Sequence, residues 1–445
     1  MQKVYLLSLG CPKNLIDSEN MLKIIKDNKL QVTENPEEAD VAVVNTCAFI
    51  GDAKEESVDC ILELADLKQE NLKHLIVTGC LSQRYSDELM KEIPEIDGII
   101  GTGRYEDINK MISELREKEQ KLNYVDDIKK YKEYKELKRE KITPDHYAYL
   151  RIAEGCDNFC TYCIIPGIRG SYRSRKIEDI KNEAQELAQK GVKELIVIGE
   201  DITFYGKDLY GTTMLTELLK ELVKIEGLQR IRLLYAYPNN ITEELLQLMA
   251  KEEKICKYLD MPVQHISDRI LKLMGRNITG KEIKEIIKRA RELMPDIVFR
   301  TSLISGFPNE TEEDHNELLE FVKEYKIERL GVFHYSKEEG TPAYKLKNQI
   351  PEEIKISRRN ELMEAQYLNV LDYNEKRIGR IEKVIIDGFD GIFFEGRTCG
   401  EAVEIDPVIL VKYDDSIKAG DIINCRIIHV NDYDLVGEME SEFAE

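Results

Sequence analysis

The stretch Cys156-Asp157-Asn158-Phe159-Cys160-Thr161-Tyr162-Cys163 places three cysteines within eight residues, in the spacing CxxxCxxC. Three thiolates at this spacing can ligate three irons of a [4Fe-4S] cluster and leave the fourth iron open for another ligand. An apolar, strand-like run at 147–152 precedes the motif, and a loop begins at Gly155. The cysteines are therefore predicted to lie at the end of a strand, where α/β folds place their chemistry.

Other interpretations of these cysteines stay open at this point. A structural zinc site commonly takes four ligands from two CxxC-type pairs, and this motif has no second pair or nearby histidine beside it. Disulfide frameworks are typical of small secreted domains, whereas this chain has 10 cysteines in 445 residues. The spacing thus favours an iron–sulfur cluster over zinc, disulfides or cysteines that only fill a core.

The sequence around and after the motif predicts an α/β domain over residues 142–372. Strand-like runs are separated mostly by helical patterns such as 177–189 and 281–294. Six βα units indicate an open (β/α)6 barrel, because the closed barrel of this type has eight. The six runs are 147–152, 194–199, 230–237, 258–263, 298–304 and 330–335.

Loops at the carboxyl ends of these strands contain further candidates. Glu200 follows the second run directly, and its carboxylate either binds a cofactor amine or lies near a helix N-terminus as a structural acid. Ser305 and Gly306 follow the fifth run, and they offer either a close approach for a ribose or adenine edge or a tight turn. The basic segment 166–175 either holds a carboxylate of the cofactor or substrate, or forms a solvated face. Its arginines are Arg169, Arg173 and Arg175.

A second group of cysteines is predicted at one edge of an N-terminal sheet. Residues 1–117 alternate strand and helix patterns, which indicates parallel βαβ units in a Rossmann-like domain. Strand-like runs at 4–9, 41–44 and 75–77 are each followed within three residues by a cysteine; these are Cys11, Cys47 and Cys80. Parallel strands end at one edge, so the three thiols are expected to converge there and to form a second cluster site. The alternative is that they are buried as small hydrophobes.

The other four cysteines show no such pattern. Cys60 falls within a helical pattern, and Cys256, Cys399 and Cys425 fall in strand or loop contexts. We expect these four to be structural and without partners.

The rest of the chain divides into a linker and a terminal domain. Residues 118–141 are rich in Lys, Glu, Asp and Tyr, which predicts a charged linker. Residues 374–441 contain short β-type runs between Gly and Asp turns, which predicts a small antiparallel β-barrel of the oligonucleotide-binding type. The runs are 382–386, 391–395, 407–412, 422–429 and 435–438.

Charge and hydropathy narrow the class of partner. The formal net charge is −21 at pH 7, and residues 371–445 contain 18 Asp and Glu against 8 Lys and Arg. Proteins that grip nucleic acid tend to be basic, so this chain favours a basic protein partner instead. The sequence has no apolar run of about 20 residues and no signal-peptide pattern. We therefore expect a cytoplasmic protein that does not contact membranes.

These features resemble, over nearly the whole chain, the methylthiotransferase branch of the radical S-adenosylmethionine enzymes. The resemblance implies an N-terminal methylthiotransferase domain, a radical core and a terminal TRAM domain. It implies that the CxxxCxxC cluster binds S-adenosylmethionine, with Tyr162 near the adenine and Glu200 at the cofactor's amine. The family's second [4Fe-4S] cluster falls on the three cysteines that the strand ends select.

Within that family, residues 10–19 and 165–175 are similar to the RimO branch, which modifies an aspartate on the twelfth protein of the small ribosomal subunit. The tRNA-modifying, MiaB-like branch usually has Gln-Met-Asn after the first cysteine, and Pro12-Lys13-Asn14 departs from it. The resemblance thus implies insertion of sulfur and a methyl group at the aspartate β-carbon, with an electron donor as a further partner. The alternatives are a tRNA adenosine methylthiotransferase, a non-catalytic iron–sulfur scaffold and a zinc-stabilised ribosome-binding protein.

Overall fold

The computed structural model describes residues 2–118, 120–135 and 137–440, which form two compact units. The first unit contains Met1–Ile142, Ala153–Arg175 and Glu338–Thr341, and the second contains Thr143–Ile152, Lys176–Lys337 and Pro342–Glu445. The sequence predicts the CxxxCxxC loop within the range 142–372. By its contacts, this loop belongs to the same unit as the N-terminal residues.

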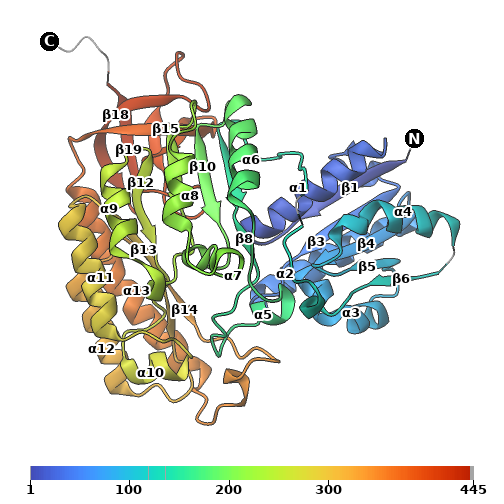
Figure 1. Cartoon of the computed structure of the whole chain (residues 1–445), viewed down its shortest axis with the longest axis horizontal. Helices are drawn as coiled ribbons and strands as arrows, with labels where there is room; N and C mark the ends of the chain where they lie inside the picture. Colours follow the sequence, from blue (N-terminus) through green and yellow to red (C-terminus); the bar gives the residue numbers. More distant parts are fainter. Residues whose placement is uncertain (1, 119, 136, 441–445) are drawn as a thin grey trace. The chain divides into compact units, whose positions relative to one another are not determined.

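The first unit contains a six-stranded, wholly parallel sheet in the order β2-β1-β3-β4-β5-β6 (Figure 1). The strands are β1 (Lys3–Ser8), β2 (Gln31–Thr33), β3 (Val41–Thr46), β4 (His74–Gly79), β5 (Gly98–Ile100) and β6 (Leu122–Tyr124). The parallel α/β prediction is confirmed. The sequence patterns reveal only β1, β3 and β4, because a strand of three residues is too short to show alternation.

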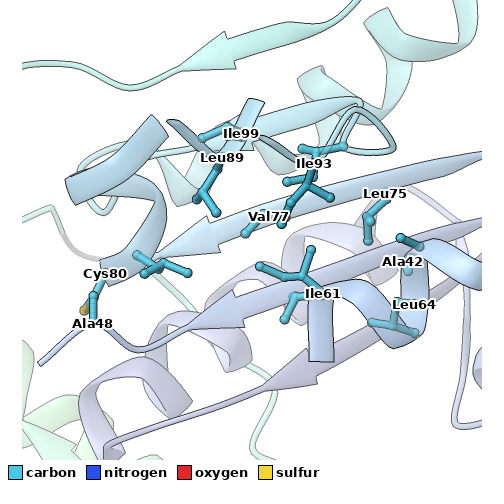
Figure 2. Close-up of a cluster of buried hydrophobic side chains, with 14 of the residues drawn as sticks. Ala42, Ala48, Ile61, Leu64, Leu75, Val77, Cys80, Leu89, Ile93 and Ile99 are labelled. Atoms are coloured by element: carbon cyan, nitrogen blue, oxygen red, sulfur yellow. The ribbon is translucent and has the colours of Figure 1, made fainter. Parts of the chain in front are cut away.

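Helices cover both faces of this sheet. α1 (Pro12–Asp27) and α4 (Ile108–Glu117) pack on one face, while α2 (Gly51–Asp66) and α3 (Cys80–Glu92) pack on the other. Figure 2 shows part of the core on the face covered by α2 and α3, where Ile61 of α2 and the strand residue Val77 belong to one buried cluster. Cys80 belongs to the same buried cluster at the end of β4.

The described residues of the range predicted as a charged linker, 118–141, include two short elements. Strand β6 pairs with β5 and so extends the sheet, and a 3-10 helix (η4) spans Ile128–Lys130. Leu122 and Ile128 are the buried apolar anchors of these elements. Single apolar positions among many charges do not form a periodic pattern, so neither element stands out in the sequence.

The second unit contains the six-stranded sheet predicted for the core. All of its pairs are parallel, in the order β14-β13-β12-β11-β10-β7, and the edge strands β14 and β7 leave it open (Figure 1). The strands are β7 (Tyr147–Arg151), β10 (Glu194–Ile198), β11 (Arg230–Leu233), β12 (Ile255–Asp260), β13 (Val298–Ser305) and β14 (Arg329–His334). The connecting helices include α6 (Ile177–Gln189), α8 (Leu215–Leu222), α9 (Glu243–Lys251), α11 (Gly280–Leu293) and α12 (Glu312–Tyr325).

Helix α13 (Glu352–Glu375) leads into a closed β-barrel, drawn in red in Figure 1. Its strands are β15 (Ile381–Phe389), β16 (Phe393–Arg397), β17 (Ile409–Lys412), β18 (Ile422–Asn431) and β19 (Asp434–Met439). The five-stranded barrel is confirmed. One pairing differs from the prediction, because β17 and β19 run parallel where the barrel closes.

The barrel is anchored to the amino ends of the core strands by buried ion pairs. Glu194, the first residue of β10, accepts hydrogen bonds from Arg232 Nε at 2.7 Å and from Arg397 Nη1 at 2.5 Å. Glu401 accepts in the same way from Arg329 Nη2 at 2.7 Å. The carboxyl ends of the core strands are thereby left for chemistry, as in other α/β barrels.

One cysteine prediction is wrong. Cys256 of β12 and Cys399, which follows β16, lie close enough for their thiols to interact, so the expectation of no partner fails for these two. The pair is invisible in the sequence because its members come from the core sheet and the terminal barrel. Cys425 is buried in the barrel core and Cys60 lies in α2, as expected.

The described part of the chain contains no helix that is both long and apolar enough to span a membrane.

Candidate functional site

Cys11, Cys47 and Cys80 lie at the carboxyl ends of three neighbouring strands. Cys11 is the N-cap residue of α1, Cys47 follows β3, and Cys80 is the first residue of α3. The strand order reverses between β1 and β3, and open α/β sheets bind ligands at such a point. Two of the thiols sit at helix N-termini, whose partial positive charge stabilises a thiolate.

Asparagine side chains tie these strand ends together. Asn14 Nδ2 donates to Leu9 O at 3.0 Å and to Thr46 O at 2.9 Å. Asn45 Nδ2 donates in turn to Asn14 O at 2.8 Å. These bonds fix the backbone just before the first and second cysteines.

Glycines precede the first and third of these cysteines for a steric reason. Gly10 has a φ of +84°, and a Cβ there would lie 3.1 Å from Cys47 Sγ. Gly79 has a φ of +95°, and a Cβ there would lie 2.3 Å from Asn45 Oδ1. Only glycine meets both requirements. Electrostatic interactions link all three thiols, so the structure brings this predicted trio together.

The donor set of this trio, three cysteine thiols, fits an iron–sulfur cluster. Burial raises the pKa of Cys80 to about 12 and also raises the pKa of Cys47, and the Arg169 guanidinium opposes both shifts. In the ranges described above, no three His, Cys, Asp or Glu side chains are placed to share one metal ion. Cysteines of a four-iron cluster bind different irons, so they do not need to meet at one point.

The CxxxCxxC loop is closed at its base by a short ribbon. Strand β8 (Ala153–Glu154) pairs antiparallel with β9 (Arg173–Ser174). Cys156 N donates to Gly170 O at 3.1 Å and continues this closure. Residues 153–175 all belong to the first unit, and this ribbon brings the two ends of the loop together.

Inside the loop, backbone amides point at the last two cysteines. Cys163 N donates to Cys160 O at 3.0 Å, and Ile165 N donates to Cys163 Sγ at 3.5 Å. An amide hydrogen bond to sulfur is one means by which proteins tune iron–sulfur clusters. Phe159 adopts a φ of +49° and is 65% exposed, while Tyr162 is half-buried. The donor set of this turn fits the predicted cluster.

The arginines of the basic segment do not form a solvated face. Arg169, Arg173 and Arg175 are all at least nine-tenths buried, so that alternative is wrong. Arg173 Nη1 donates to Ser171 O at 2.8 Å, and the Arg175 guanidinium lies 5.4 Å from the ring centroid of Tyr134. The segment therefore serves the protein's own packing.

Arg169 holds carboxylates, but they are the chain's own. Its Nη1 donates to Asp17 Oδ2 at 2.6 Å and to Glu154 Oε1 at 3.0 Å. Its Nη2 donates to Asn14 Oδ1 at 2.5 Å and lies 3.8 Å from Cys80 Sγ. Asn14 and Asp17 fall within the motif at 10–19, yet nothing in the sequence links them to residue 169.

The remaining candidates lie in the second unit, at the carboxyl ends of core strands. Glu200 is half-buried after β10, and the neighbouring Asp201, rather than Glu200, caps the 3-10 helix η5 (Ile202–Phe204). Ser305 Oγ donates to Lys355 O at 3.1 Å. Gly306 has a φ of +70°, and a Cβ there would lie 2.3 Å from Lys355 Cγ. Packing against α13 accounts for this glycine, and the role of both residues toward a cofactor stays a prediction.

Comparison with known families matches three regions of the chain. Residues 150–322 match the Radical SAM superfamily, residues 3–101 match the uncharacterized protein family UPF0004, and residues 378–439 match the TRAM domain.

Three relatives that match over the full length carry one name. The chain is 51% identical to the ribosomal protein uS12 methylthiotransferase RimO of Acetivibrio thermocellus, over 100% of both chains. It is 50% identical to the protein of the same name from Clostridioides difficile, again over 100% of both, and 47% identical to that of Geobacter sulfurreducens over 99% of both.

Solved structures share the fold at low identity. The radical S-adenosylmethionine methyltransferase TsrM from Kitasatospora setae aligns with a TM-score of 0.59 and 14% identity, over 77% of each chain. The cobalamin-dependent S-adenosylmethionine radical enzyme OxsB aligns with a TM-score of 0.52 and 14% identity, over 83% of this chain and 57% of OxsB.

Proposed function

Because this chain belongs to the RimO family of ribosomal protein uS12 methylthiotransferases, we propose that it attaches a methylthio group to uS12 by radical S-adenosylmethionine chemistry. The full-length identity to proteins of that name carries the proposal. The atom that we infer to be modified is the β-carbon of an aspartate. The C–H bond of such a carbon is strong and only very weakly acidic, and a radical cofactor can break it.

Two [4Fe-4S] clusters are assigned to the two cysteine groups. The cluster that binds S-adenosylmethionine would be held by Cys156, Cys160 and Cys163. The one-electron chemistry of this cofactor can take hydrogen from an unactivated carbon. The second cluster would lie on the trio at the edge of the N-terminal sheet. Neighbouring strand ends, glycines before two of the thiols and helix N-termini support this assignment.

The chain's own residues would then bind and orient the reactants. Tyr162 is assigned to the adenine, Glu200 to the cofactor's amine, and Ser305 with Gly306 to its nucleoside edge.

The domain roles that we infer are methylthiotransferase domain (1–117), linker (118–141), radical core (142–372) and TRAM domain (374–441). An electron donor must supply the reducing equivalent. Thiol-ligated clusters and a ribosomal substrate are consistent with work in the cytoplasm.

The TRAM barrel offers a surface suited to a basic protein. Phe389, Ile392 and Tyr413 are 47%, 71% and 58% exposed, and the rings of Phe389 and Tyr413 lie 5.5 Å apart. Asp390 lies between the first two, and Asp414 and Asp415 directly follow the third. We define these six residues as the aromatic–acidic patch. A ribosomal protein grips RNA through Lys and Arg, and such cations pair with acids and aromatic faces.

The variant Tyr413→Ala/Asp415→Lys is expected to raise KM for uS12 about tenfold with little change in kcat, since tenfold in affinity corresponds to ~1.4 kcal/mol. The reason is that the patch would bind substrate equally before and during the reaction. Initial rates at varied uS12 would measure it. Glu353→Lys, at an exposed position of α13, makes the same charge change outside the patch and is expected to leave KM unchanged. A normal KM in the patch variant would remove this surface from substrate binding.

The proposed function is tested by reconstituting the protein with iron and sulfide under anaerobic conditions. The protein is then incubated with S-adenosylmethionine, a reductant and either uS12 or unmodified tRNA. Mass spectrometry is expected to show one methylthio group on an aspartate of uS12 and no change in the tRNA. A modified adenosine in tRNA would show instead that tRNA is the substrate. If S-adenosylmethionine is not cleaved, the protein is better explained as a non-catalytic iron–sulfur scaffold. If iron also fails to bind, a zinc-stabilised protein is the better explanation.

A further inference from the structure

Arg169 is a buried cation at the junction of both cysteine groups. Arg169 is 2% exposed and follows α5 (Ile165–Ile168), the short helix just after the CxxxCxxC motif. Its guanidinium reaches Asn14 and Asp17 on the helix that begins at the first cysteine of the trio. It also reaches Cys80 of the trio and Glu154, two residues before the CxxxCxxC motif.

The contact with Cys80 has a chemical consequence. A guanidinium keeps its charge in proteins, so this group presents a permanent positive charge and an N–H donor 3.8 Å from the sulfur. Hydrogen bonds to cysteine sulfur and nearby charge are among the factors that set the reduction potential of an iron–sulfur cluster. Both factors favour the more negative, reduced state of a cluster bound there.

The two carboxylates around Arg169 limit this effect. Asp17 pairs with Nη1, and its side chain is only 4% exposed, so little solvent screens its charge. Burial of two acids with one guanidinium would be costly without such close pairing. The pair therefore holds the guanidinium in place and also offsets part of its field.

We infer that Arg169 is a positioning residue for the second cluster: it aligns the trio with the CxxxCxxC loop and raises the reduction potential of the cluster through Cys80. This inference rests on the proposed cluster at Cys11, Cys47 and Cys80. Arg169, a residue outside that trio, thereby controls the reduction potential of the bound cluster.

The test is an EPR-monitored redox titration of the full-length, reconstituted protein. The second-cluster signal is identified as the one that persists in a Cys156→Ala/Cys160→Ala/Cys163→Ala variant. Arg169→Gln is expected to make reduction about tenfold less favourable, a downward shift of ~59 mV for one electron. Asp17→Asn removes the offsetting charge and is expected to shift the potential upward. A merely structural role would not produce shifts of opposite sign.

The controls separate the possible outcomes. Lys23→Gln removes a cation that pairs with Asp27 at the exposed far end of α1, and it is expected to leave the potential unchanged. If Arg169→Gln binds less iron, two other variants test the inference. Arg169→Lys is expected to leave the reduction potential unchanged, and Asp17→Asn is expected to raise it. Shifts in the same direction, or none, would overturn the inference while the second cluster stands. A wild-type chain with about four irons instead of eight, and no second signal, would refute the cluster and the inference together.

Discussion

Replacing Cys80 with alanine is expected to abolish methylthio transfer to uS12 while reductive cleavage of S-adenosylmethionine continues. Cys80 is proposed to ligate only the second cluster, whereas the cofactor is assigned to the CxxxCxxC cluster. The rate of transfer should fall at least ~100-fold, equivalent to about 2.7 kcal/mol of transition-state stabilisation. Mass spectrometry of uS12 measures transfer, and chromatography of 5′-deoxyadenosine measures cleavage.

Two further variants define this result. Cys160→Ala removes a ligand of the other cluster and should stop both cleavage and transfer. Cys60→Ala removes a half-buried thiol of the same domain, on α2, and should leave both intact. Methylthio transfer at a near-normal rate by Cys80→Ala would exclude the second cluster from the reaction.

The second large effect concerns stability. Glu194→Gln is expected to lower the free energy of unfolding by about 3–5 kcal/mol, because it leaves buried guanidiniums without their carboxylate. Arg232 and Arg397 both donate to Glu194, and all three side chains are almost fully buried. The midpoint of urea unfolding, followed by circular dichroism, would report the loss. Glu221→Gln removes a half-buried carboxylate that pairs with the solvent-accessible Lys181 and Lys224, and it should leave the midpoint nearly unchanged.

This stabilisation should depend on pH. Burial alone would raise the pKa of Glu194, but Arg397 and Arg232 prevail and lower it to about 2. In the unfolded chain a glutamate has a pKa of about 4.3. A carboxyl whose pKa is lower in the folded protein stabilises the fold at pH values above its unfolded pKa. This stabilisation is lost as the pH falls toward the folded pKa. The gap in midpoint between wild type and Glu194→Gln should therefore be full above pH ~5 and shrink between pH ~4 and ~2. A gap that does not change with pH would contradict the ionic explanation.

Much of the fold follows from local patterns. Apolar runs of three to eight residues predict the six core strands, three of the N-terminal strands and the strands of the terminal barrel. Strands β2, β5 and β6 escape prediction because each has only three residues. The parallel pairing β17–β19 also escapes, because it depends on how the barrel closes.

The position of the cysteine trio follows from the same logic. A cysteine after each of three parallel strands must lie at one sheet edge, so topology alone brings Cys11, Cys47 and Cys80 near one another. The spacing CxxxCxxC is likewise a local feature. Both candidate centres can therefore be derived from the order of residues along the chain.

The contacts of the charged residues required the folded chain. Arg169 lies 152 residues from Asp17 and 89 residues from Cys80, and Glu194 lies 203 residues from Arg397. Periodicity reports which face of an element is apolar, but a charged side chain has the same sequence signature in solvent and in a buried ion pair. Which it becomes depends on the opposite charge that packing brings to it, and only the tertiary structure decides that.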